Sequence, residues 1–300
     1  MAIGTIDPED KKYPKALKKA LKVLVPSMGP KILYYKGNWP ALSKAEGDDI
    51  FKNCLAVVGS RRLTSYGRRM TQQLVTEVAS AGITIVSGFM YGGDEAAHTA
   101  AVKAGGRTIA VMPCGIDIIF PPNQKELYNR ILENNGLIIS EYPEGFKPVN
   151  YSFVQRDRVV AGLSKAVFVT EASLNSGSLV TANYATRYGK KIFALPGPVT
   201  SEVSKGTLKL IKEGAEPVAE ARDILTFFNI LAGESNKKET PVFNGTKLEQ
   251  DIIGQLKLEP MDVDLISRNL NIAAAKIGTT ISLLQLKGFI NQDSGKYYIN

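Results

Sequence analysis

The chain has 300 residues, 44% of them hydrophobic, which is enough for one large buried core and a smaller second module. It carries 37 basic and 29 acidic residues, and the net charge of +8 favours an anionic partner, although solubility alone also explains a modest excess. Two cysteines are too few for a disulfide-dense secreted scaffold, so we expect a cytoplasmic protein. No apolar signal core opens the chain and no apolar run approaches about 18 residues, so we expect no membrane span.

Residues 1–52 form a basic N-terminal extension that leads into the core. Residues 9–36 are rich in lysine, and these charges either form a solvated face or help to bind an anion. The run ILYYKGNWP at 32–40 predicts a short strand that leads into a turn.

A regular alternation fills residues 53–230: a short β-branched apolar run, a Gly or Ser loop, and a longer segment with helical spacing. Three predicted helices, at 65–81, 94–104 and 178–188, each end at a glycine, as a left-handed helix terminus requires. This rhythm predicts an α/β domain with a doubly wound, mostly parallel sheet covered on both faces. The predicted strands are residues 54–58, 83–87, 108–112, 137–140, 166–171 and 191–194.

Residues 231–246 have the composition of a linker, and residues 247–300 predict a small winged-helix-like domain. The linker contains GESNKKETPVFNGT, which has no apolar period. Three amphipathic helices follow, and the strands GFINQ and KYYIN turn at residues 293–295. The predicted recognition helix, around residues 273–280, is almost uncharged, which favours a protein-contact or dimer-stabilising role over the reading of a DNA duplex.

In a doubly wound sheet, ligands bind beyond the carboxyl ends of the strands, where helix N-termini present free N–H groups to anions. Gly59, Ser60, Arg61 and Arg62 follow the first predicted core strand directly. Glycine permits a close turn, serine can donate to a phosphate, and arginine offers a bidentate fork. A plain strand-to-helix turn with solvated arginines would look similar, so this tetrapeptide leaves both interpretations open.

The loop after the second core strand contains Gly88, a candidate binding residue, and two adjacent glycines, Gly92 and Gly93, that would let a ligand backbone approach. Asp94 suits the N-cap of the next helix. His98 is the single histidine, and neither a nucleophile nor metal-ligand spacing accompanies it. We interpret His98 and Cys114 as packing residues. The sequence therefore predicts no catalytic residue, no metal site and no cofactor.

Phe153 precedes Arg156 and Arg158 at the start of a predicted helix. An aromatic ring beside arginines can stack on a base and bind phosphates, which fits single-stranded nucleic acid better than a small metabolite. The alternative is an ordinary capped helix.

Ser176, Gly177 and Ser178 lead into another helix, where hydroxyls and free N–H groups favour a phosphate. A well-capped helix start would again look the same. Lys205, in the last loop of the domain, is a further candidate for the rim of the site.

These segments together resemble the DNA processing protein A (DprA, also called Smf) family, in order and spacing over residues 53 to about 226. The similar segments are GSRR, SGFMYGGDEAAH, PCGIDIIFPP, SEYPEG, FVQRDRVVAGLS, EASLNSGSLVTA, FALPG and GTLKLIKEGA. The resemblance implies an extended Rossmann fold, a winged helix, binding of single-stranded DNA, a homodimer, and delivery of DNA to a RecA-type recombinase in transformation or recombination.

The chain departs from the family pattern at Met90, Tyr91 and Gly93, and Asp157 stands where the family usually has asparagine between two arginines. An added carboxylate there should weaken anion binding. Two alternatives stay open on the same fold: a sensor of a nucleotide-type ligand, and an enzyme similar to the lysine-decarboxylase-like phosphoribohydrolases. In the second case Glu171 lies before the strand-to-helix loop, and the catalytic place after it holds no carboxylate.

Overall fold

The computed structural model describes residues 2–23, 29, 31–39, 49–230, 245–293 and 295–299. The chain forms two compact units, Met1–Ala232 and Gly233–Asn300, each with its own hydrophobic core. Residues 231–244 of the predicted linker lie outside the described residues. The first unit includes the N-terminal extension, predicted as residues 1–52 leading into the core.

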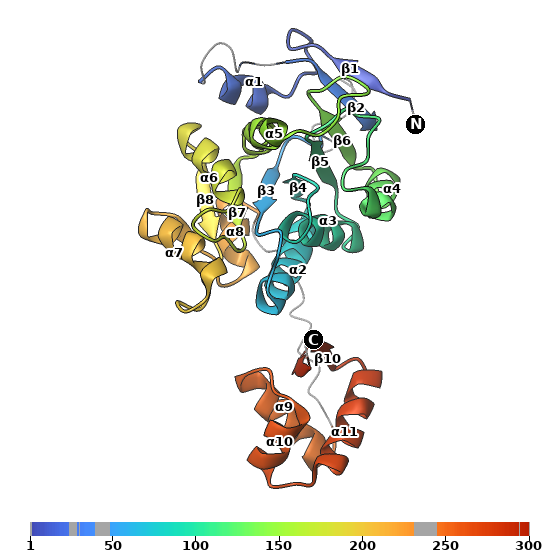
Figure 1. Ribbon diagram of the computed structural model, residues 1–300, viewed down its shortest axis with the longest axis vertical. Helices are drawn as coiled ribbons and strands as arrows, with labels where there is room; N and C mark the ends of the chain where they lie inside the picture. Colours follow the sequence, from blue (N-terminus) through green and yellow to red (C-terminus); the bar gives the residue numbers. More distant parts are fainter. Residues whose placement is uncertain are drawn as a thin grey trace. The chain divides into compact units, whose positions relative to one another are not determined.

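Within the described residues, the first unit is built on one sheet with the strand order β1-β2-β6-β5-β4-β3-β7-β8-β9 (Figure 1). Strands β3 to β9 run parallel, whereas β2 is antiparallel to β6 and β1 is antiparallel to β2. The predicted mostly parallel α/β class is confirmed, and all six predicted core strands form. The strands are β1 Gly4–Ile6, β2 Leu33–Gly37, β3 Cys54–Val58, β4 Thr84–Ser87, β5 Thr108–Met112, β6 Leu137–Ser140, β7 Ala166–Val169, β8 Lys191–Ala194 and β9 Glu216–Pro217.

The strand order contains one reversal, and it lies at β3. From β3 the chain builds outward through β4, β5 and β6, and it then returns to pair β7 with the other side of β3. Loops that leave β3 and β7 therefore diverge onto opposite faces, and a crevice opens between them at the carboxyl end of the sheet. The fold alone therefore predicts a ligand site in this crevice.

Side chains alternate between the two faces of the sheet, and each face is covered by helices (Figure 1). In β3, Ala56 packs with the face covered by α1, α5 and α6, and Val57 packs with the face covered by α2, α3 and α8. The helices of the first unit are α1 Lys15–Leu21, α2 Ser65–Ser80, α3 Gly93–Lys103, α4 Lys125–Glu133, α5 Asn150–Leu163, α6 Ser178–Arg187, α7 Lys205–Lys212 and α8 Ala221–Phe227. Both faces are thus buried, as the near-continuous apolar strands require.

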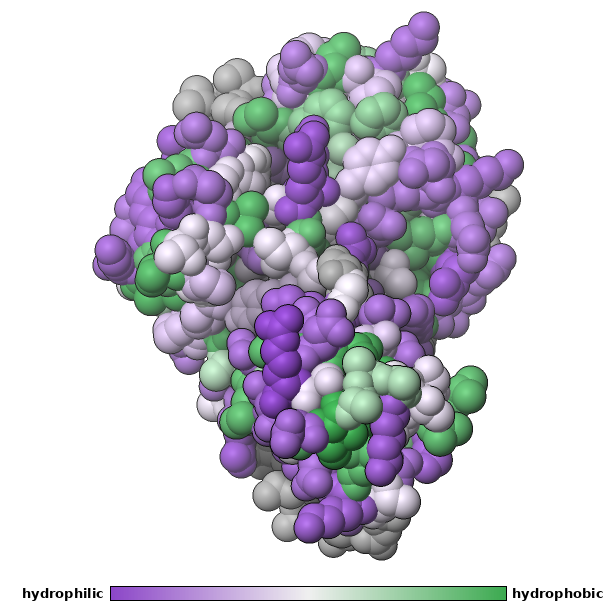
Figure 2. All heavy atoms as spheres, turned by 60° about the horizontal axis from the view of Figure 1, so that its bottom comes forward, coloured by the Kyte–Doolittle hydropathy of each residue, from purple (hydrophilic) through white to green (hydrophobic). Residues whose placement is uncertain are grey.

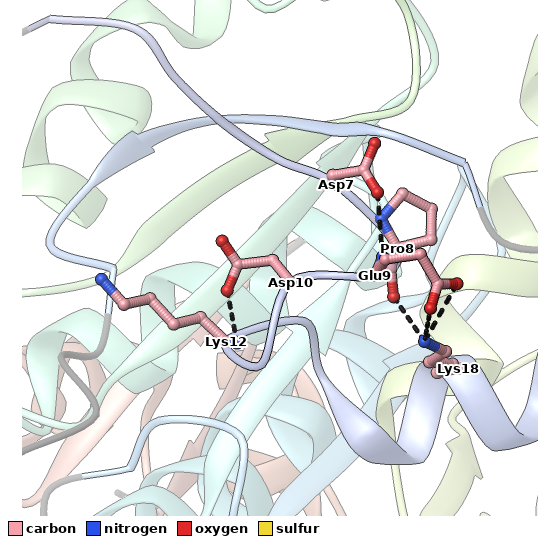
Figure 3. A network of polar contacts seen from close by, with 6 residues as sticks. All are labelled: Asp7, Pro8, Glu9, Asp10, Lys12 and Lys18. Carbon is pink, nitrogen blue, oxygen red and sulfur yellow. Dashed lines mark hydrogen bonds and ion pairs between the residues drawn. The ribbon is translucent and has the colours of Figure 1, made fainter.

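The N-terminal segment adds an antiparallel edge to the sheet and also contributes the short helix α1. A polar network holds the turn between β1 and α1 (Figure 3). The Lys18 ammonium donates to the Pro8 carbonyl at 2.7 Å and to the Glu9 carboxylate at 3.2 Å, and Asp10 Oδ1 accepts from the Lys12 backbone N–H. The ammonium group of Lys18, at least, is therefore used in contacts within this N-terminal segment.

The second unit has the predicted winged-helix outline. It contains α9 Lys247–Leu258, α10 Val263–Leu270, α11 Ala274–Leu286, β10 Ile290–Asp293 and β11 Lys296–Ile299, around a core of isoleucine and leucine side chains. Thr246 and Glu249 form a reciprocal capping box at the start of α9, and Glu249 also pairs with Lys287 at 2.6 Å. Of the predicted turn between the two strands, Ser294 lies outside the described residues.

Among the helices the structure describes, none is both long and apolar enough to cross a membrane. On the face drawn in Figure 2, hydrophilic residues predominate and hydrophobic residues occur in small groups between them. Such a surface is ordinary for a folded domain in water.

Helix α5 is fixed to the end of β6 by a buried ion pair. Arg158 Nη2 donates to both Glu141 carboxylate oxygens, at 2.7 and 2.6 Å, and the two side chains are only 1% and 3% exposed. Burial raises the pKa of Glu141, although the Arg158 guanidinium acts to lower it. The pair is therefore a structural element of the domain.

We expect Arg158→Met to lower the free energy of unfolding by about 3–5 kcal/mol, because it leaves the Glu141 carboxylate buried without its partner. Urea denaturation followed by circular dichroism measures this loss. The double variant Arg158→Met with Glu141→Leu should recover much of it, because no charge is then left unpaired.

Lys209 provides the matched control. It pairs with Glu213 at 3.7 Å, and both side chains are more than half exposed, so Lys209→Met should cost less than about 1 kcal/mol. Equal losses at Lys209 and Arg158 would contradict the structural role of the buried pair.

Candidate functional site

A cavity of about 600 Å³ opens at the carboxyl end of the sheet, at the reversal point beside β3. Its walls come from the loops after β3 and β4, the first two turns of α5 and the start of α6. Ten of the twelve predicted site residues line it: Gly59, Ser60, Arg61, Arg62, Gly88, Phe153, Arg156, Ser176, Gly177 and Ser178. The structure thus brings together segments that are far apart in the sequence.

The loop after β3 is locked to the end of β7 by Glu171. The Glu171 carboxylate accepts from the backbone N–H of Thr64 at 2.8 Å and from its hydroxyl at 2.5 Å, and the Glu171 carbonyl accepts from the Ser60 N–H at 2.7 Å. On the other side, a Cβ on Gly93 would lie 2.6 Å from Gly59 Cα, so glycine is needed for the close approach of α3. Arg61 and Arg62 therefore extend, exposed, from a well-fixed loop.

Arg61 lies over the ring of Phe153, with its guanidinium carbon 5.4 Å from the ring centroid. Phe153 also meets Phe120 edge to face at 5.8 Å. An arginine held against an aromatic ring presents a flat cationic surface on which a base can stack, and its remaining N–H groups can reach a phosphate.

Arg156 lines the cavity but is only 4% exposed. Its Nη1 donates to the carbonyls of Gly88 and Val111, the second at 2.7 Å, and so joins α5 to the ends of β4 and β5. Its Nε lies 3.1 Å from Asp157 Oδ1 without the alignment of a hydrogen bond. Arg156 is therefore mainly an anchor for α5, and its charge is balanced within the wall of the cavity.

Two carboxyl groups, Asp94 and Asp157, lie beside Arg156 in the cavity wall. Burial raises the pKa of Asp157 to about 7; the Arg156 guanidinium opposes this rise and Asp94 adds to it. Burial also raises the pKa of Asp94, again against the effect of Arg156. These two carboxyl groups make the inner wall less favourable for an anion than the arginine rim.

The start of α6 is open to the cavity. Gly177 lines the cavity, and a Cβ added to it would meet nothing within 4 Å. Gly177 itself gives no side-chain cap, and the Ser176 hydroxyl accepts from the Ser178 N–H at 3.4 Å. The hydroxyls of Ser176 and Ser178 lie 2.8 Å apart at the same end. An anion here would find two hydroxyl donors and the positive end of the helix dipole.

Two predicted site residues do not reach the cavity. Arg158 is buried against Glu141, as described above, so its predicted role as a binding residue is corrected to a structural one. Lys205 is exposed at the start of α7, where it pairs with Glu202, and it is not part of the cavity wall.

The structure adds wall residues that the sequence argument missed, among them Asn150, Val154 and Thr181. Asn150 lies three residues before Phe153 on α5, and Thr181 lies three residues after Ser178 on α6. Residues three apart share one face of a helix, so helical spacing from the predicted residues could have identified these two. Val154 directly follows Phe153, and no such spacing singles it out.

His98, both cysteines and Glu171 are buried, so none of these four residues is available in the cavity for acid, base or thiol chemistry. His98 is fully buried with Nδ1 2.7 Å from Thr108 Oγ1, and burial lowers its pKa to about 3. Burial raises the pKa of Cys54 and of Cys114 to about 12. Glu171 is 3% exposed and bonded to Thr64 through both carboxylate oxygens. Among the described residues, no group of three His, Cys, Asp or Glu side chains could hold a metal ion.

Comparison with known proteins agrees with this architecture. Residues 4–229 match the family described as DNA recombination-mediator protein A, and residues 236–296 match the DprA winged helix domain. The protein Smf of Synechocystis sp. is 30% identical over 98% of this chain and 79% of its own length.

Two solved structures are similar to about three quarters of the chain. DNA processing protein A of Streptococcus pneumoniae aligns with a TM-score of 0.66 and 34% identity, over 75% of this chain and 74% of that one. DNA processing protein A of Helicobacter pylori, whose structure describes a single-stranded DNA binding mode, aligns with a TM-score of 0.64 and 32% identity, over 76% of this chain and 96% of that one. Because the family match covers well over half of the residues, the chain belongs to the DNA recombination-mediator protein A family, also called DNA processing protein A or Smf.

Proposed function

We propose that the cavity beside β3 binds single-stranded DNA, with phosphates at its rim and a base inside. The observation that carries this proposal is the position of Arg61 over the ring of Phe153, at a cavity whose rim also holds Arg62 and the start of α6. A cationic edge next to an aromatic platform is the combination that single-strand binding requires. The Helicobacter pylori relative, with its single-stranded DNA binding mode, supports the same assignment.

Each part of the rim has a distinct task. Arg61 and Arg62 bind phosphates through charge-assisted hydrogen bonds, Ser176 and Ser178 donate hydroxyl hydrogens, and Gly177 leaves room for the phosphate at the helix start. Because most of the binding free energy comes from phosphates, affinity should fall steeply as salt rises.

The wider role we propose is that of a cytoplasmic, non-enzymatic protein that protects incoming or processed DNA and loads a RecA-type recombinase onto it, acting as a homodimer. Family membership supports this role. The burial of His98, Cys114 and Glu171 supports the absence of catalysis. Light scattering tests the dimer, and strand exchange by a recombinase with and without this protein tests loading.

A nucleotide sensor is the second candidate, because a cavity of about 600 Å³ also suits one small ligand. Gel-shift competition with single-stranded, duplex and mononucleotide competitors separates the two. Displacement of the labelled strand by mononucleotide at concentrations similar to those of oligonucleotide would favour the sensor.

We expect Arg61→Ala to weaken single-stranded DNA binding and to reduce the slope of log affinity against log salt concentration by about 0.7, since one phosphate contact is lost. Fluorescence anisotropy over a salt series measures both. Arg222, exposed on α8 and outside the cavity wall, is the matched control, and Arg222→Ala should leave affinity and slope unchanged. An Arg61→Ala variant that behaves like the control would rule out this site.

Affinity for an all-thymine strand should also rise as the pH falls from about 8 to about 6, with a midpoint near the Asp157 pKa of about 7. The Asp157 carboxyl, whose pKa is raised by burial, gains a proton over this range, and one negative charge leaves the cavity. Asp94 on α3, Arg156 on α5 and Arg61 after β3 face the same group. His98 does not titrate here, because its pKa is about 3.

The variant Asp157→Asn isolates this effect. It should bind an all-thymine strand more tightly than the unmodified protein does at mildly alkaline pH, and it should lose most of the dependence of that affinity on pH. A variant whose affinity still changes with pH as strongly as before would assign the titration to another group.

A further inference from the structure

The charges of the cavity are arranged in two layers. Arg61 and Arg62 are exposed at the rim, whereas Asp94, Arg156 and Asp157 are largely buried in the inner wall. When Asp157 is ionised, its charge offsets that of Arg156, whereas the rim carries two exposed positive charges. A phosphate is therefore favoured at the rim, and a group that approaches the Asp157 carboxylate inside the cavity must present hydrogen-bond donors.

Asp157 is the inner carboxylate that remains available to a ligand. Its side chain is 15% exposed, and its Oδ1 meets Arg156 Nε as an ion pair without hydrogen-bond alignment. Asp94 differs, because its Oδ2 already accepts from the Met90 backbone N–H at 3.2 Å and it is only 7% exposed. An ionised carboxylate has about four lone-pair sites, so Asp157 can accept several donors.

Asp157 and Phe153 are four residues apart on α5, so they share one face of the helix, and both line the cavity. A base stacked on the Phe153 and Arg61 platform would therefore turn one edge toward the Asp157 carboxylate. In a single strand this is the Watson–Crick edge, which is free. In a duplex the same edge is occupied by the partner base.

The four bases differ in what they offer to a carboxylate along this edge. Guanine presents two adjacent donors, N1–H and the N2 amino group, which match the two carboxylate oxygens. Adenine and cytosine present one amino donor beside a ring nitrogen acceptor, and thymine presents one N–H between two carbonyl oxygens. Each acceptor beside the donor would repel a carboxylate oxygen.

We propose that Asp157 is a specificity-determining residue that reads the Watson–Crick edge of an unpaired guanine, giving this protein a preference for guanine at one position of the bound strand. The inference rests on the proposed single-stranded DNA function. The contact between Asp157 and guanine would add a base preference to binding that otherwise depends mainly on phosphates. It would also explain why a carboxylate that opposes anion binding lies in the inner wall.

The test uses the full chain and an all-thymine oligonucleotide as the reference strand. In otherwise identical oligonucleotides, single thymines spaced too far apart for guanine self-association are replaced by 7-deazaguanine, hypoxanthine, adenine or cytosine. The 7-deazaguanine base keeps the Watson–Crick edge of guanine, and hypoxanthine lacks the N2 amino group. Fluorescence anisotropy competition, about one pH unit on either side of the Asp157 pKa of about 7, gives the relative affinities.

On the alkaline side we expect 7-deazaguanine strands to bind at least about fivefold more tightly than the all-thymine strand, the lower end of what one bidentate base contact supplies. Hypoxanthine should lose most of this gain. The preference should shrink on the acidic side, where Asp157 is protonated, although the affinity for the all-thymine strand rises. Asp157→Asn should abolish the pH dependence of the preference and most of its size, whereas Asp251→Asn, an exposed aspartate on α9, should change neither.

The outcomes distinguish failure of single-stranded DNA binding from failure of the base preference. If no strand binds, the proposed function itself fails. If all strands bind equally, or if the preference for 7-deazaguanine persists unchanged in Asp157→Asn, single-stranded DNA binding stands and the role of Asp157 as a base reader is overturned. The base analogues act on the unmodified protein, so equal binding of all strands is decisive whether or not the variant folds.

Discussion

The candidate site depends on how the first turns of α5 are held against the carboxyl ends of β4 and β5. Arg156 provides this attachment, because its buried Nη1 donates to the carbonyls of Gly88 and Val111. A buried guanidinium is costly unless its charge and its N–H groups are met. In one orientation of the helix the two backbone carbonyls accept from Nη1 and the Asp157 carboxylate balances the charge, and that orientation directs Phe153 and Asp157 into the cavity.

The attachment also determines the electrostatics of the site. Because Arg156 is committed to the sheet, it contributes little free positive charge, and the exposed arginines of the loop after β3 must supply the attraction for an anion. The ionised Asp157 carboxylate offsets the positive charge of Arg156. Because burial raises the pKa of Asp157 to about 7, the net charge of this pair changes near neutral pH. Carboxyl groups with strongly shifted pKa values are common at functional sites, and here the shift and the cavity coincide.

The sequence predicted most of this architecture, because the buried parallel strands and the glycines that end the helices are strong local signals. It missed β1 and β9, because strands of three and two residues are too short to show an alternation of apolar and polar side chains. It also grouped Arg156 with Arg158, although residues two apart on a helix point about 200° apart. One therefore faces the cavity and the other faces Glu141. The sequence reasoning also overlooked the pairing of Lys205 with Glu202, although the two are three residues apart, a spacing at which opposite charges on a helical turn can meet.

Glu171 shows how one fold can serve either binding or chemistry. Its buried carboxylate does not line the cavity: both of its oxygens are bonded to Thr64, and a Cβ added to Gly67 would overlap it. The residue thus uses its hydrogen-bonding capacity to order the loop that carries Arg61. A loop that is already ordered loses less conformational entropy when a DNA strand binds. A larger part of the free energy of each phosphate contact therefore contributes to the affinity. Under this arrangement the carboxylate that an enzyme would keep free instead fixes the geometry of the rim.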